Sequence, residues 1–223
     1  MKLIDYRTLV FDCDGVILDS NRIKTEAFRQ AALPYGAAAA DALVTYHLIN
    51  GGISRYAKFE YFLKNIIKGI EPNSGGLALQ SLLKDYAIAV KEGLMECAVC
   101  KGLGDLREAM PNQTWLIVSG GDQTELREIF AARGIDHYFD GGIFGSPDSK
   151  EAILSREQAA QTITPKALFL GDSTYDYRAS HAAGIDFVFV SGWSELPDWA
   201  EFIRKEKISS VSSISELSID FSL

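Results

Sequence analysis

Four short apolar runs mark the strands that the sequence predicts: residues 8–12, 114–119, 166–172 and 187–191. They are rich in Val, Ile, Leu and Phe and barely alternate with polar residues, which is typical of strands buried on both faces of a parallel sheet. Helical patterns lie between them. The one over 122–134 opens on Asp122, carries Glu125 three residues later and closes at Gly134. This alternation predicts an α/β fold with a doubly wound, mainly parallel sheet covered by helices on both faces.

The chain between the first two predicted strands has a different pattern, in which apolar residues recur at helical spacing. Turn residues interrupt it, most clearly the Asn-Gly-Gly of residues 50–52. The sequence therefore predicts an α/β core domain over residues 1–20 and 98–223, with an all-helical domain inserted at residues 21–97. We expect the serine-rich stretch from Ser209 onward to be a short, loosely packed end.

The composition narrows the class of protein. A net charge of −8 over 223 residues argues against nucleic-acid binding, which needs a basic face. No apolar run approaches the roughly 20 residues that span a bilayer, so we expect no membrane partner. A signal peptide has a cationic stretch followed by an apolar one, and Asp5, Arg7 and Asp12 interrupt that order here, so we expect a cytoplasmic protein. The oligomeric state stays open between a monomer and a homodimer.

Three cysteines occur, and Cys97 and Cys100 match the spacing C-x-x-C. A zinc site needs two more ligands at suitable spacing, and no second pair is present. The flanking residues are not those of a thioredoxin-like redox motif, so we interpret these cysteines as incidental.

Polar residues gather where the predicted strands end. In an open parallel sheet, ligands bind beyond the carboxyl ends of the strands. If the first three predicted strands are neighbours, these residues converge: Asp12, Asp14, Ser119, Gly120, Asp172 and Asp176. Two like charges about 4 Å apart repel by about 4 kcal/mol at an effective dielectric of 20, so such a cluster needs a cation. Carboxylate ligands of this kind suit Mg²⁺, which also bridges to phosphate.

Other readings of these residues fit less well. An EF-hand that uses Gly15 as its loop glycine would make Val10 the first calcium ligand, which is impossible. Alone, Ser119 would be a turn or cap residue and Lys150 a solvated lysine. Their order and their places at or near strand ends favour a functional site. The motifs of P-loop proteins, serine hydrolases and dinucleotide-binding proteins are absent from the sequence.

The sequence resembles the haloacid dehalogenase superfamily of phosphohydrolases over nearly its whole length. The resemblance rests on FDCDGV (11–16), LIVSGG (116–121), Lys150 in GSPDSK (145–150) and GDSTYD (171–176), which are similar to that family's four motifs. It implies a Rossmann-like core, and the helical segment lies where the family's C1 cap domain lies. The likeness is to members of the phosphoglycolate phosphatase and β-phosphoglucomutase type.

The resemblance also implies catalytic roles. Asp12 would attack phosphorus and form an aspartyl-phosphate, and Asp14 would protonate the leaving oxygen and later deprotonate water. Asp12, the backbone carbonyl of Asp14 and Asp172 would hold Mg²⁺. Asp176 would bind the ion through water or orient the lysine. The phosphoryl oxygens and the nucleophile's charge would be stabilised by three further groups: Ser119, Gly120 and Lys150.

These roles predict a Mg²⁺-dependent phosphatase that acts on a small phosphorylated metabolite. Asp14 argues against the family's dehalogenases and phosphonatases, which lack this acid. A sugar phosphomutase stays open as an alternative, although such enzymes usually carry a histidine four residues after the Ser or Thr that follows the first motif. Counting from Ser20 gives Lys24 instead. A catalytically idle relative with a binding or regulatory role is the alternative from another class.

The inserted helical segment would set the choice of substrate by closing over the site. In residues 50–59, two glycines could form a tight turn that brings Arg55 over the active site, where it would grip phosphate or carboxylate. The alternative is that Arg55 only caps or decorates a helix. Lys24 and Lys58 are weaker candidates. The three histidines show no ligand spacing, and we expect structural roles for them: His47, His137 and His181.

Overall fold

A computed structural model describes residues 2–67, 75–217 and 220 of the chain. Among them, six parallel strands form one sheet in the order β3-β2-β1-β4-β5-β6. Their bounds are β1 (Thr8–Phe11), β2 (Thr114–Asp122), β3 (Gly142–Ser146), β4 (Ala167–Gly171), β5 (Asp186–Val190) and β6 (Ser209–Val211). The parallel sheet with flanking helices confirms the predicted α/β fold.

The register of the central strands decides which residues meet. Phe11 at the end of β1 pairs with Ile117 of β2 on one side and with Leu170 of β4 on the other. The chain runs outward from β1 through β2 to β3 and then returns to β4 beside β1. The strand order therefore reverses at β1, and a ligand crevice is expected beyond the carboxyl ends of β1 and β4.

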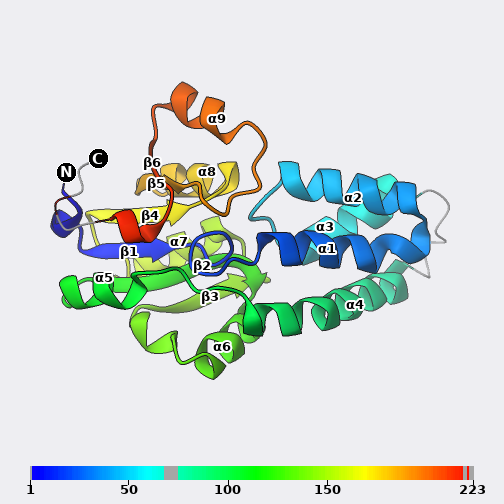
Figure 1. The fold of residues 1–223 in the computed structure, drawn as a ribbon, viewed down its shortest axis with the longest axis horizontal. Coiled ribbons are helices and arrows are strands. Elements are labelled where there is room, and N and C mark those ends of the chain that lie inside the picture. Colours follow the sequence, from blue (N-terminus) through cyan, green and yellow to red (C-terminus); the bar gives the residue numbers. More distant parts are fainter. Residues whose placement is uncertain (1, 68–74, 218–219, 221–223) are drawn as a thin grey trace.

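Helices cover both faces of the sheet (Figure 1). Leu126 and Phe130 of one helix pack in the apolar cluster that also holds Phe11, whereas Ile153 and Ala179 of two others belong to a second cluster. These helices are α6 (Gln123–Ala132), α7 (Lys150–Ala159) and α8 (Thr174–Ala182). The α/β part of the chain also contains α5 (Leu103–Ala109) and α9 (Trp199–Glu206). The predicted cap of α6 is present, because Asp122 Oδ1 accepts a hydrogen bond from the Glu125 amide at 3.0 Å.

Four helices lie beyond the carboxyl edge of the sheet (Figure 1): α1 (Asn21–Ala32), α2 (Ala37–Ile49), α3 (Arg55–Tyr61), which continues as a π-helical turn, and α4 (Gly75–Glu96). The rings of Phe28, Phe59 and Tyr86 join three of them, with centroids 4.4–5.8 Å apart. The described part of the predicted helical segment is thus helical, while residues 68–74 lie outside the described residues. Its status as a separate domain stays a prediction. No helix in the described ranges has both the length and the apolar character needed to cross a bilayer.

Two strands were not predicted. β3 escapes detection because two of its five residues are glycines. The expectation of a loosely packed end from Ser209 was wrong as far as residue 217. Ser209–Val211 pairs with β5, and the side chains of Val211, Ile214 and Leu217 are buried. Three buried apolar residues spaced three apart hold this stretch against the core. The serines between them make the stretch look polar, so its sequence does not predict the packing.

Candidate active site

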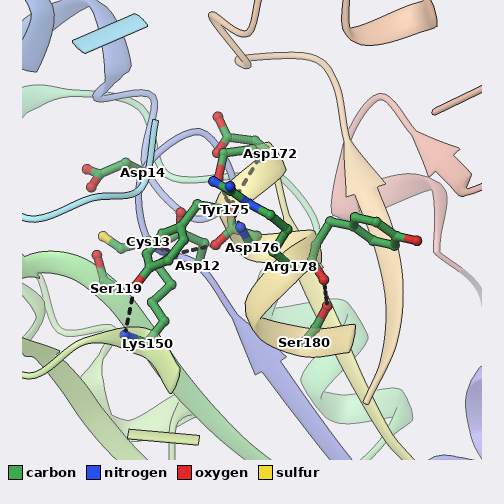
Figure 2. A network of polar contacts seen from close by, with 12 residues as sticks. Asp12, Cys13, Asp14, Ser119, Lys150, Asp172, Tyr175, Asp176, Arg178 and Ser180 are labelled. Carbon is green, nitrogen blue, oxygen red and sulfur yellow. Dashed lines mark hydrogen bonds and ion pairs between the residues drawn. The ribbon is translucent and has the colours of Figure 1, made fainter. Parts of the chain in front are cut away.

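The strands β1, β4 and β2 bring most of the predicted site residues together (Figure 2). Asp12 directly follows β1, Asp172 directly follows β4, and Ser119 lies in β2. Lys150 begins α7 and Asp176 lies in the first turn of α8. All five side chains are buried. The fold therefore gathers acids that are up to 164 residues apart in the sequence, as the strand-end argument predicted.

The Lys150 ammonium links two of these acids. Its Nζ lies 2.9 Å from Asp12 Oδ1 and also donates a hydrogen bond to Asp176 Oδ1. Although burial opposes it, the two carboxylates raise the pKa of Lys150 above its usual range. Asp176 Oδ2 accepts hydrogen bonds from the Ser173 amide at 3.1 Å and the Ser173 hydroxyl at 2.6 Å. Both oxygens of Asp176 are therefore engaged by protein groups, and its carboxylate holds the lysine in place.

A metal ion could bind beside this pair, because Asp12, Asp172 and Asp176 each offer an oxygen within 4.8 Å of the others. Asp172 Oδ2 accepts a hydrogen bond from Asn21 Nδ2 at 2.7 Å, and Asp12 Oδ1 accepts one from the Cys13 amide at 2.7 Å. In the described part of the chain, no hydrogen bond engages the second oxygen of Asp12 or Asp172. These two acids can therefore bind an ion directly, and an all-oxygen set with few carboxylates fits Mg²⁺.

The electrostatics of the cluster also favour a cation. Burial, opposed by the Lys150 ammonium and reinforced by neighbouring carboxylates, raises the pKa of Asp12 to about 7. Burial and the charges of Asp12 and Asp176 raise the pKa of Asp172 well above its usual value. One lysine does not offset the charge of three buried acids. A divalent ion would supply the missing positive charge and keep both ligands ionised.

The Asp14 carboxylate lies apart from this cluster and is held by the start of α1. Its oxygens accept hydrogen bonds from the Ser20 hydroxyl and the Lys24 ammonium, each at 2.5 Å. Burial acts to raise the pKa of Asp14, but Lys24 and Ser20 outweigh it and lower the pKa below its usual value. Asp14 is therefore ionised in this arrangement and is fixed at the boundary between the core and the helical segment.

Residues 119–121 form the opposite side of the site. Ser119 Oγ accepts a hydrogen bond from the Gly121 amide at 3.0 Å. Within the described ranges no residue accepts its own hydroxyl hydrogen, which can therefore bond a ligand. A Cβ on Gly120 would lie 2.1 Å from the carbonyl oxygen of Gly52, so the loop of the helical segment approaches β2 too closely for any side chain there. The two parts of the chain thus meet at Gly120, which the sequence predicted to bind phosphate together with Ser119.

Comparison with known proteins assigns the family. The model of the haloacid dehalogenase-like hydrolases matches residues 6–184. The chain belongs to this family. Among curated proteins, the chain is 24% identical over 192 residues to the fructose-1-phosphate phosphatase YqaB of Escherichia coli, covering 83% of this chain and 96% of that protein.

Solved structures share the fold. A predicted phosphatase from Clostridium acetobutylicum matches with a TM-score of 0.73 and 18% identity, over 95% of this chain and 96% of that one. A predicted phosphoglycolate phosphatase from Haemophilus somnus matches with a TM-score of 0.63 and 19% identity, over 83% and 85% of the two chains. This haloacid dehalogenase-like protein is therefore a hydrolase built on the α/β architecture of its family.

The helical segment of this hydrolase covers a small cavity, of about 60 Å³, that is also lined by Asp12, Asp14 and Asp172. Arg55 lines the cavity as predicted, but its guanidinium faces Glu125 of α6, with Nη2 3.0 Å from Oε2, and lies 5.1 Å from the centre of the Tyr86 ring. Lys24 and Lys58, the weaker candidates, line the same cavity. Lys24 and Lys58 reach the cavity because α1 and α3 pack over the edge of the sheet. The spacing of residues in the sequence does not predict this packing.

Sequence reasoning missed some residues of the site. Asn21 also donates to the Trp193 carbonyl at 2.8 Å and so joins α1 to Asp172, yet nothing beyond its place at a helix start marks it. His47, to which we assigned a structural role, lines the cavity, whereas His137 and His181 do not. Cys97 and Cys100 are free thiols, and no cysteine belongs to a metal-binding group among the described residues.

Proposed function

We propose that the protein is a Mg²⁺-dependent phosphatase that hydrolyses a small phosphomonoester, such as a sugar phosphate or phosphoglycolate, through an aspartyl-phosphate on Asp12. The observation that carries the proposal is the buried arrangement of Asp12, Lys150 and Asp172 at the sheet's switch point. The family and the phosphatase names of the relatives support the same chemistry. The small size of the cavity favours a compact substrate.

Asp12, Asp172 and the backbone carbonyl of Asp14 would hold the ion. When bound, Mg²⁺ would neutralise charge on the phosphoryl oxygens and the acids. Lys150 favours the ionised form of Asp12 and orients its carboxylate, and Asp176 fixes Lys150 through its Oδ1. The Ser119 hydroxyl and the Gly120 amide can donate hydrogen bonds to the phosphoryl oxygens, which stabilises the charge that spreads over them during transfer.

The reaction needs two displacements at phosphorus. A carboxylate oxygen of Asp12 attacks the phosphorus, the bond to the leaving oxygen breaks, and Asp14 gives that oxygen a proton. Asp14 must first take up a proton and separate from Lys24, so a substrate that draws Lys24 away favours this step. A water then attacks the aspartyl-phosphate while Asp14 accepts its proton, which releases phosphate and restores Asp12.

An assay with para-nitrophenyl phosphate tests the proposal. Wild-type protein should hydrolyse it only with Mg²⁺, and Asp12→Asn should reduce kcat by at least about 10³-fold, because the nucleophile is lost. The exposed Asp136→Asn serves as a matched control and should retain activity. Undiminished activity of Asp12→Asn would exclude this nucleophile. A phosphomutase would instead interconvert two sugar phosphates and need a bisphosphate activator, and an idle relative would hydrolyse nothing.

A further inference from the structure

Three basic side chains of the helical segment reach the cavity, and all three are buried: Lys24, Arg55 and Lys58. Lys24 forms an ion pair with Asp14 at 2.5 Å, and Arg55 forms one with Glu125 at 3.0 Å. Lys58, with only 2% of its surface exposed, makes no ion pair with any carboxylate in the described ranges. Of these three basic side chains, Lys58 is therefore the one without a paired carboxylate among the described residues.

Among the described residues, the direct contacts of Lys58 supply a hydrogen-bond acceptor but no carboxylate. Its Nζ lies 2.7 Å from His47 Nδ1 and 5.3 Å from the centre of the Phe28 ring. The His47 and Phe28 rings pack against each other with centroids 4.6 Å apart. Burial and the nearby lysines lower the pKa of His47 well below its usual value, so the ring is neutral and its Nδ1 can accept a hydrogen bond from the lysine.

An ammonium in such a place weakens the fold unless something offsets its charge, because it has left water without gaining a counterion. Burial and the Lys24 charge lower the pKa of Lys58 to about 7. Methionine would fill similar space without this cost. A cation kept in a cavity that also holds the catalytic acids indicates that its counterion arrives with the ligand.

We propose that Lys58, positioned by His47 and Phe28, binds a second anionic group of the substrate, either a carboxylate or a second phosphate. This inference rests on the proposed function, because it takes the phosphomonoester to lie at Asp12. The transferred phosphoryl group and the second anion then occupy one cavity, whose wall includes Asp12 and Gly120 from the core and Lys58 from the helical segment. A short chain would join the two groups, since Asp12 and Lys58 line the same cavity.

Three phosphonates, which cannot be hydrolysed, test the subsite. Propylphosphonate has a neutral tail, phosphonopropionate ends in a carboxylate at the same length, and propane bisphosphonate ends in a second phosphonate. Their dissociation constants are measured by titration calorimetry with Mg²⁺ present. Wild-type protein should bind at least one of the anionic ligands about 10- to 100-fold more tightly than propylphosphonate, as a charge-assisted hydrogen bond in a buried site allows. Which one it prefers identifies the second anion.

Three variants test whether Lys58 causes the preference for anionic tails. In Lys58→Met, the ratio of affinities between anionic and neutral tails should fall to about one. His47→Phe, which keeps an aromatic ring on Phe28 but removes the acceptor, should lower the ratio as well. Lys64→Met makes the same change at an exposed lysine of the same segment and should keep the wild-type ratio. A wild-type ratio near one for both anions, or a wild-type ratio retained in Lys58→Met and His47→Phe, overturns the subsite.

These measurements are independent of turnover. If the preference is present but no phosphomonoester is hydrolysed, the subsite stands and the proposed phosphatase reaction fails. If phosphomonoesters are hydrolysed but the preference is absent, the reaction stands and the subsite fails.

Discussion

Arg55 of α3 and Glu125 of α6 form an ion pair, with Nη2 and Oε2 3.0 Å apart, that joins the helical segment to the core. Both side chains are largely shielded from water, and the charge of Glu125 raises the pKa of Arg55 although burial opposes it. Tyr56, the next residue of α3, donates a hydrogen bond to Asp122 Oδ2 at 2.8 Å and adds a second link. The start of α6 thus holds α3 over the cavity.

Glu125→Gln should weaken this closure. The buried guanidinium would keep a hydrogen-bond acceptor but lose its counterion, and we expect the free energy of unfolding to fall by about 1–3 kcal/mol and KM to rise severalfold. Urea unfolding and steady-state kinetics measure both effects. Glu128→Gln, an exposed position on the same helix, is the control. Equal stability of the two variants would mean that the ion pair does not hold α3.

Removing the metal should destabilise the protein. An ion that binds only the folded chain adds about 3 kcal/mol at one hundred times its dissociation constant, so EDTA should lower Tm relative to excess Mg²⁺. Asp172→Asn removes a proposed ligand and should abolish this difference, whereas Asp136→Asn should retain it. A Tm that does not respond to Mg²⁺ in wild-type protein would argue against an ion between Asp12 and Asp172.

Gly120→Ala should disturb the contact between the two parts of the chain. Its new Cβ would lie 2.1 Å from the Gly52 carbonyl oxygen, which is backbone and cannot rotate away. The loop must therefore shift, and we expect KM to rise by about tenfold and the stability to fall by about 1–3 kcal/mol. Gly121→Ala is the neighbouring control, since its Cβ would meet only the Leu126 side chain at 3.3 Å. Similar behaviour of both variants would count against a specific contact at Gly120.

The central strands and the acids that gather at their ends could be predicted because their signal is local. β1 is an uninterrupted apolar run that ends at Asp12, and β4 likewise ends just before Asp172. Given parallel neighbours, the geometry of the sheet then brings their ends together. β3 and β6 lack such a run, since glycines and serines fill them. Their pairing comes from the neighbouring strand rather than from their own side chains.

The contacts of the helical segment could not be predicted in the same way. Lys58 and His47 lie on different helices, 11 residues apart, and meet only because α2 and α3 pack together over Phe28. Arg55 was expected over the active site and does line the cavity, while its binding of substrate stays a prediction. Its partner Glu125 is 70 residues away and belongs to the core. Such contacts depend on how helices are placed in space, which periodicity alone does not determine.

The buried ammonium of Lys58 should leave a signature in the pH dependence of stability. Its pKa is lowered from 10.5 to about 7 in the folded protein, so between about pH 7 and pH 10 the unfolded chain binds a proton that the folded chain lacks. Stability therefore rises with pH across this window, by at most about 4 kcal/mol, and the full cost of burial remains below pH 7. The charged or titratable groups that act on it come from four elements: His47, Lys24, Asp12, Asp14 and Lys150.

Comparison with Lys58→Met isolates this contribution, because every other group titrates in both proteins. We expect the variant to be more stable than wild-type protein near pH 7 and the gap to close as the pH approaches 10. Urea unfolding at several pH values in EDTA measures the gap, and Lys64→Met should run parallel to wild-type protein throughout. A constant gap between Lys58→Met and wild-type protein would mean that Lys58 keeps an ordinary pKa when buried, and that some group in the folded chain already serves as its counterion.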